Sequence, residues 1–173
     1  PPPLGKGRGK TTGWIHRAAL RMKRVELMGG VNYERIDEHV AGADADGDAF
    51  RERYHGKVAL LSAEELAEAM VERERIESVF TRAIYYAHLQ FATNMADPTR
   101  GALMARLQES GAALEAKLLF FGLEWAEVDD ATADAVLADP ALAHWRHALA
   151  SMRKFRPYLL SEPEEKILTE KAV

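Results

Sequence analysis

The sequence contains no cysteine and no long uncharged apolar run. The absence of cysteine excludes disulfides, thiolate catalysis and cysteine-based zinc sites. Without an apolar run, the sequence predicts neither a membrane span nor a signal peptide, so we expect a cytoplasmic protein. The remaining composition, 47% hydrophobic and 29% charged over 173 residues, is typical of one globular domain with room for an appendage.

Charge is distributed unevenly along the chain. Residues 1–40 hold eight Lys or Arg and four acidic residues, a net charge of +4, so the rest must carry −8 to reach the total of −4. A basic head on an acidic body is typical of a nucleic-acid tail, a targeting peptide or two segments of different origin. Trp14 is a single aromatic residue in the head, which makes a weak case for nucleic acid. We expect no nucleic-acid or membrane partner.

From residue 62 onward the pattern is helical. Ser62 and Glu65 have the spacing of a capping box, which marks a helix start. An apolar stripe follows at Ile76, Phe80, Ile84, Ala87 and Phe91. The charged turn at residues 72–75 interrupts the stripe from Leu66 and Met70, so either the helix bends there or that turn lies outside the core.

Two Asp-Pro pairs predict further helix starts, because Asp caps a helix and Pro is tolerated in its first turn. After Asp97 comes the strongest periodic signal in the sequence, with members at Leu103, Leu107, Gly111, Leu114, Leu118, Phe121 and Trp125. Asp139 starts a second such helix, which Pro157 ends near Phe155. Ser161 and Glu164 form another capping box, opening a helix that runs to Val173.

The predicted fold class is therefore all-α: a multi-helix, bundle-like lobe over residues 43–173. Residues 1–42 form a basic appendage that either holds a short helix and two short strands (Val25–Met28 and Val31–Ile36) or is irregular. The acidic stretch from Asp44 to Asp48 is interpreted as a linker or a helix start.

Two familiar motifs match incompletely. Gly9-Lys10-Thr11 resembles the end of a phosphate-binding loop, but the first glycine of that motif is replaced by Leu4. Asp44, Asp46 and Asp48 have the alternate spacing of a calcium loop, but Ala49 and His55 stand where that loop needs Gly and Glu. We expect neither nucleotide nor calcium binding.

His144 and His147 have the spacing of two metal ligands on one helix, but a zinc site needs a third or fourth ligand. We interpret them as an exposed pair and expect no metal site and no catalytic residue in this chain. Tyr85, Tyr86 and His88 cluster on one helix, where the three residues could line a peptide channel. The alternative is that the two adjacent tyrosines pack in the core with their hydroxyls at the surface.

Three segments of the body resemble the N-terminal region of oligoendopeptidase F: residues 50–58 (FRERYHGKV), 117–126 (KLLFFGLEWA) and 156–171 (RPYLLSEPEEKILTEK). The resemblance runs from about Ala43 to Val173. It implies a helical lobe that helps to form and close the channel of a thimet-like zinc metallopeptidase acting on short cytoplasmic peptides.

In that family an H-E-x-x-H helix and a later Glu hold the zinc, which activates water for attack on the peptide bond. No H-E-x-x-H occurs in this sequence, so the resemblance carries no catalytic residue and no cofactor to this chain. The hypothesis is a non-catalytic channel or gating part of a zinc oligopeptidase, whose partners are a catalytic lobe and, in the full-length protein, oligopeptides. The alternative is a free-standing helical module that self-associates through exposed apolar helix faces.

The head resembles a different family. Leu4-Gly5 with residues 9–17 (GKTTGWIHR) and 30–37 (GVNYERID) is similar to part of bacterial 2,4-dienoyl-CoA reductase. This resemblance implies a piece of the dinucleotide-binding region of a flavin and iron–sulfur enzyme. The glycine-rich fingerprint of that region and the cysteines that bind the iron–sulfur cluster are absent here. Flavin or dinucleotide binding by the head ranks last among the hypotheses, and the junction near residues 38–44 suggests a chimera, fused or engineered, without native function.

Overall fold

The computed structural model describes residues 35–171, and its contacts separate residues 1–36 from a unit that starts at Asp37. Residues 1–34, which carry the expected head, lie outside the described part. Within that part no strand occurs, which confirms the all-α prediction. The helices are α2 (Ile36–Tyr54), α3 (Ala63–Thr93), α4 (Pro98–Glu127), α5 (Asp130–Leu137), α6 (Arg146–Lys154) and α7 (Glu162–Lys171), with short 3₁₀ turns η2 (Val58–Leu60), η3 (Pro140–Leu142) and η4 (Arg156–Tyr158).

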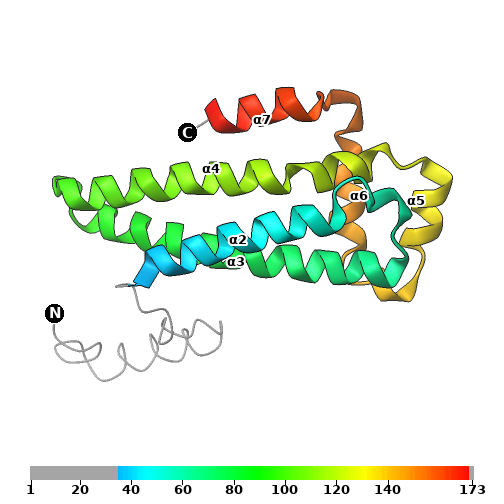
Figure 1. Ribbon diagram of the computed structural model, residues 1–173, viewed down its shortest axis with the longest axis horizontal. Helices are drawn as coiled ribbons and strands as arrows, with labels where there is room; N and C mark the ends of the chain where they lie inside the picture. Colours follow the sequence, from blue (N-terminus) through cyan, green and yellow to red (C-terminus); the bar gives the residue numbers. More distant parts are fainter. Residues whose placement is uncertain (1–34, 172–173) are drawn as a thin grey trace, which may run out of the picture. The chain divides into compact units, whose positions relative to one another are not determined.

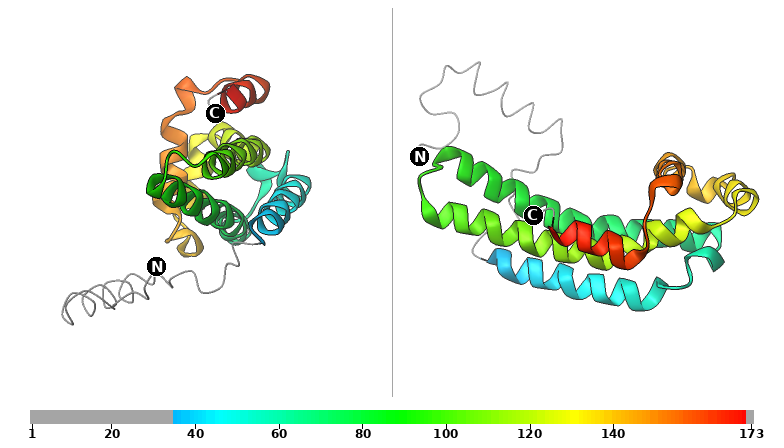
Figure 2. Two further views of the ribbon diagram at one scale, coloured as in Figure 1. Left: turned by 90° about the vertical axis from the view of Figure 1, so that its left-hand side faces the viewer. Right: turned by 90° about the horizontal axis from the view of Figure 1, so that it is seen from above.

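The two longest helices form an antiparallel pair. α3 has 31 residues and α4 has 30, and they pack along each other, while α2 runs beside both (Figure 1). α7 packs along α4, and α5 and α6 lie at the end where α4 finishes (Figure 2). Within residues 35–171, parts of α6 and α7 border one side of the α3–α4 pair.

The expected caps start the helices. Ser62 Oγ accepts a hydrogen bond from the Glu65 amide while the Glu65 carboxylate accepts one from the Ser62 amide, which confirms the capping box. Asp97 accepts a hydrogen bond from the Thr99 amide at the start of α4. These side chains satisfy backbone N–H groups that have no partner inside the helix. At α7 the bonding differs, because both the Ser161 hydroxyl and its amide donate to Glu164.

Between residues 129 and 154 the helices differ from the prediction. Asp139-Pro140 begins a 3₁₀ turn instead of an α-helix, and the α-helix starts at Arg146. The turn tightens because Leu142 is fully buried, and the Leu142 and Ala143 amides bond to carbonyls three residues back. α5, capped by Asp129, was not predicted.

The acidic stretch between Asp44 and Asp48 lies inside α2, which begins earlier than expected and runs across the predicted junction between residues 42 and 43. Ile36, expected to end a strand, is the first residue of α2, and Arg35 before it is in a 3₁₀ conformation; residues 31–34 of that expected strand lie outside the described range. The charged turn at residues 72–75 lies outside the core, as one of the two alternatives predicted. α3 is continuous there, and these four residues are half-buried or exposed.

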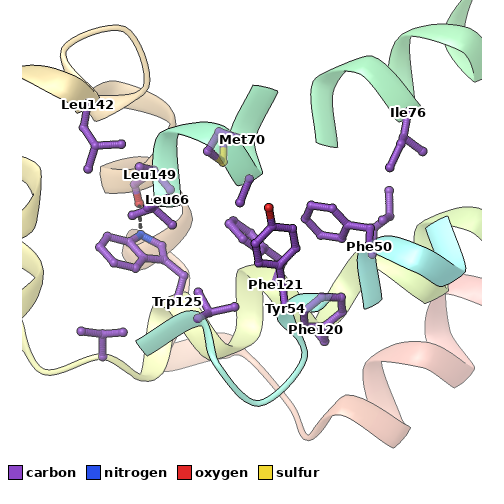
Figure 3. Close-up of a cluster of buried hydrophobic side chains, with 14 of the residues drawn as sticks. Phe50, Tyr54, Leu66, Met70, Ile76, Phe120, Phe121, Trp125, Leu142 and Leu149 are labelled. Carbon is purple, nitrogen blue, oxygen red and sulfur yellow. Dashed lines mark hydrogen bonds between the residues drawn. The ribbon is translucent and has the colours of Figure 1, made fainter. Parts of the chain in front are cut away.

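The core is built around aromatic side chains from α2 and α4. The Phe50 ring centroid lies 5.9 Å from that of Phe120 and 5.6 Å from that of Phe121 (Figure 3). α2 comes close to α4 because it presents Gly47 at the contact, where an added Cβ would lie 2.7 Å from Leu114 Cδ1. Most of the apolar stripe predicted on α4 is buried: Leu114, Leu118, Phe121 and Trp125 belong to this cluster, and Leu107 is buried outside it.

Trp125 joins α4 to α6. Its side chain is 2% exposed, and its indole N–H donates a 3.0 Å hydrogen bond to the carbonyl oxygen of Leu149 (Figure 3). One residue earlier, the two Glu124 carboxylate oxygens accept hydrogen bonds from the Gly56 and Val58 amides at 2.7 and 3.3 Å. Gly56 has a φ of +74°, a conformation that favours glycine, so this turn of α4 also fixes the connection between α2 and α3.

We therefore expect Trp125→Ala to lower the free energy of unfolding by about 3–5 kcal/mol, through the lost burial and the cavity left behind. Trp145→Ala is the matched control, because Trp145 is only half-buried at the edge of the core and its truncation should cost clearly less. Urea titrations followed by circular dichroism would measure both. Equal costs for the two variants would contradict the anchoring role of Trp125.

Candidate binding groove

An open groove lies along the α3–α4 pair. Its volume is about 760 Å³, and it is bordered by Met152 of α6 and Thr169 of α7. Most of its lining is apolar and comes from α3 and α4, chiefly Phe80, Ile84, Ala112, Leu114, Leu118 and Leu119. A groove of this size and character can accept an apolar side chain or a short chain segment.

Two glycines of α4 shape the groove. Gly111 and Gly122 both line it, and eleven residues are close to three helical turns, so they share one face of α4. A Cβ at Gly111 would lie 3.3 Å from both Ile84 Cδ1 and Phe80 Cε1, so α3 approaches closely there. A Cβ at Gly122 would meet nothing within 4 Å. Beside Gly122, the groove is therefore not filled by any described side chain of residues 35–171.

Charged side chains form part of the rim. Arg73 Nε donates a 2.7 Å hydrogen bond to Glu77 Oε1, and the Arg73 guanidinium carbon lies 5.8 Å from the Phe121 ring centroid. Glu115 also borders the groove. The lining holds no histidine, serine or cysteine, and its hydroxyl groups come from Thr81 and Thr169.

A cluster of ion pairs fixes the start of α7 against α2. Arg51 Nη2 lies 2.6 Å from Glu162 Oε1, and His55 Nε2 lies 3.3 Å from Glu162 Oε2. His55 also faces Glu124, at 3.9 Å. Burial opposes ionisation of Glu162, but the hydrogen bonds and charges of Arg51 and His55 outweigh it and lower the pKa of Glu162 below its ordinary value.

The residues expected at a peptide channel take different positions on α3. Tyr85 is 65% exposed and His88 is exposed, while Tyr86 is half-buried between α3 and α4. Tyr86 lines a second, smaller hollow of about 440 Å³ with residues of α4 such as Arg100 and Arg106, and the lining of that hollow includes neither Tyr85 nor His88. A peptide-binding role for these three residues stays a prediction.

His144 and His147 do not share a helix, since His144 precedes α6 and His147 lies in its first turn. The His144 ring packs edge-on against Trp145, with ring centroids 4.5 Å apart. Across residues 35–171, no three His, Asp or Glu side chains are placed to hold a metal ion together.

The three aspartates of the calcium-like stretch contact cations of the protein itself. Lys117 Nζ lies 2.7 Å from Asp44 Oδ1 and 2.9 Å from Asp48 Oδ2, and Arg75 lies 2.9 Å from Asp46 Oδ2. Burial opposes the charge of Lys117, but its hydrogen bonds to Asp44 and Asp48 prevail and raise the pKa of Lys117. These pairs join α2 to α3 and α4.

Residues 124–173 match the family model described as Oligopeptidase F. The match covers the end of α4, α5, α6 and α7, and it supports the oligoendopeptidase F family and fits an N-terminal part of an oligopeptidase. No solved structure matches the chain. No finding supports the resemblance of residues 4–40 to the reductase, and the phosphate-loop-like segment at Gly9 lies outside the described residues. No helix in residues 35–171 is long and apolar enough to cross a membrane.

Sequence reasoning named Gly111 as part of the α4 stripe and did not single out Gly122 or the Glu162 cluster. Gly122 could have been noticed in the sequence, because it lies inside a strongly helical segment. Glycine weakens a helix, so its presence there suggests a site where the absence of a side chain matters. The contact of Glu162 with Arg51 joins residues 111 positions apart, and no local pattern indicates it.

Glu162→Gln tests the ion-pair cluster through its dependence on pH. Because the folded-state pKa of Glu162 is lowered, its contribution is present above the ordinary value of 4.5 and is lost as the pH falls through the folded-state value. We expect the substitution to lower the free energy of unfolding by about 0.5–1 kcal/mol at neutral pH, a difference that becomes smaller at about pH 3. Urea titrations at both pH values would measure it.

Glu74→Gln provides the control, because Glu74 is exposed on α3. Its effect should not change between the two pH values. A Glu162→Gln effect that persisted unchanged in acid would contradict the ionic origin of this contact.

Proposed function

We propose that residues 43–173 form the substrate-channel and gating part of an oligopeptidase F-type zinc peptidase, and that this part carries none of the catalytic groups. The single observation that supports this most directly is the match of residues 124–173 to the Oligopeptidase F family model. The all-helical architecture of residues 35–171 agrees with it. The proposed setting is the cytoplasm, with short peptides as substrates of the complete enzyme.

The described residues do not fit a zinc site. His144 and His147 are exposed on either side of the start of α6, and no group of three potential ligands converges anywhere in residues 35–171. A zinc peptidase site needs three protein ligands around an open position. The metal chemistry of the proposed enzyme therefore belongs to its catalytic lobe, and this part contributes by shaping the channel.

Gating requires a rigid wall with a surface that contacts the peptide. The α3–α4 pair is such a wall, since it is fixed by the aromatic core and by the ion pairs to α2. Tyr85 and His88 project from α3 into solvent and are proposed to face the channel, where aromatic rings contact peptide side chains and hydroxyl or imidazole groups bond to peptide amides.

The test of the non-catalytic part of this proposal is hydrolysis of an internally quenched oligopeptide by the purified chain with added zinc. We expect no turnover that a chelator abolishes. As a positive arm, the chain is added to the separately produced catalytic lobe of an oligopeptidase F-type enzyme, and we expect it to restore the preference for short over long peptides. Chelator-sensitive turnover by the chain alone, or no effect on the catalytic lobe, would overturn the proposal.

Self-association is the second candidate function, and exposed apolar side chains near the C-terminal end of the chain favour it. Phe155 is 63% exposed and Tyr158 is 80% exposed, and Leu160, Ile167 and Leu168 are about half-exposed. Exposed apolar groups of this size, where they gather, mark interfaces or association sites.

Light scattering over a wide concentration range would measure this association. If the C-terminal apolar residues mediate it, Phe155→Ser should raise the concentration needed for association about tenfold, which corresponds to the loss of one buried aromatic contact. Leu60→Ser on η2 is the control, because Leu60 is exposed but lies in another part of the chain. A monomer at every concentration would rule the second candidate out.

A further inference from the structure

The open groove contains unfilled apolar space, and the last helix, α7, exposes apolar side chains next to it. The groove beside Gly122 is lined by apolar side chains and is not filled by any side chain of the described residues. The adjacent helix α7, which borders the groove through Thr169, leaves Ile167 50% exposed and Leu168 54% exposed. Unfilled apolar space and unburied apolar side chains on neighbouring elements both raise the free energy of this arrangement.

α7 turns its polar side toward the body of the protein. The residues that are half-buried along it include Glu162, Glu165 and Thr169, which recur at helical spacing and share one face. A helix that packs on a globular body ordinarily buries its apolar stripe and exposes its polar face. The observed orientation of α7 is therefore set by something other than apolar burial.

Polar contacts at the first turn of α7 account for that orientation. Glu162 is the first residue of the helix, and it bonds to Arg51 and His55 of the α2 region. The chain reaches this point through Leu159 to Ser161, where no helix is formed and Leu159 has an extended conformation. The other capping bonds, from Leu160 to Glu165 and from Ser161 to Glu164, lie within this short segment and can turn with it.

We propose that α7 rolls about its own axis between the described orientation and one in which Leu168 enters the groove where Thr169 now borders it. Successive residues of an α-helix are separated by about 100°, so a roll of that size brings Leu168 to the position of Thr169. Thr169 then turns outward into solvent, and Glu162 leaves Arg51 and His55. The two orientations exchange an ion-pair cluster for the burial of one large apolar side chain, so they form a two-state element of the chain. The inference does not depend on the proposed peptidase role.

Cysteine labelling tests the roll, because the chain contains no cysteine of its own. In Thr169→Cys, the thiol is half-buried in the described orientation and exposed in the rolled one. We expect it to react with a maleimide, and Leu168→Ser to slow this reaction about fivefold, because the reactive orientation loses the side chain that stabilises it and is populated correspondingly less. Val71→Ser is the matched control: Val71 is 56% exposed, nearly the same as Leu168, and lies on α3 away from α7.

Two further variants should shift the equilibrium between the two orientations of α7. Glu162→Gln removes the ion pairs and should speed labelling of Thr169→Cys, whereas Gly122→Leu fills the groove and should slow it. Gly42→Leu is the control for the glycine substitution, because Gly42 also has no atom within 4 Å of an added Cβ but does not line the groove. Circular dichroism confirms that each variant is folded.

If α7 keeps the described orientation, Leu168→Ser has no reason to affect a thiol on another face of the helix. Labelling rates of Thr169→Cys that are unchanged by Leu168→Ser would therefore overturn the proposal. The same conclusion would follow if Val71→Ser slowed labelling as much as Leu168→Ser did, since the effect would then not be specific to α7.

Discussion

One turn of α4, from Phe121 to Trp125, anchors every long helix in the described part of the chain. Phe121 packs against Phe50 of α2, and the Glu124 carboxylate holds the amides of the turn that leads from α2 into α3. Trp125 bonds to α6 through Leu149. Burial of the aromatic side chains is favourable because it removes apolar surface from water. Burial of the neighbouring polar atoms costs little free energy because each of them has a hydrogen-bond partner.

The charged contacts around this turn of α4 contribute less to stability than the buried cluster does. Lys117 with Asp44 and Asp48, and Arg75 with Asp46, join α2 to the α3–α4 pair, but they are partly exposed and each contributes little to stability. The three aspartates lie in the same stretch of α2 as Gly47, whose added Cβ would lie 2.7 Å from Leu114 Cδ1. The Glu162 cluster has the same character at α7, where less apolar burial competes with it.

This contrast separates the helices that are fixed by apolar burial from the one that is oriented by polar contacts. α2, α3 and α4 bury large side chains against one another, so any displacement exposes apolar surface. α7 buries little and leaves Ile167 and Leu168 in solvent, so a few polar contacts at its first turn decide its orientation. An element held in this way is suited to a moving or docking role, whether in a peptidase channel or in association with another chain.

The sequence by itself determined the helical class, the starts of α3 and α4, and the buried stripe of α4, because caps and periodicity act within a few residues along the chain. It also indicated the oligopeptidase resemblance, which the match of residues 124–173 supports.

Only the tertiary structure decided that Asp139-Pro140 begins a 3₁₀ turn, since burial of Leu142 sets that geometry. It alone brought Arg51 to Glu162, and Met152 and Thr169 to the groove on α3 and α4. Such contacts join residues far apart in the chain, and their formation depends on how whole helices pack, which no local pattern encodes.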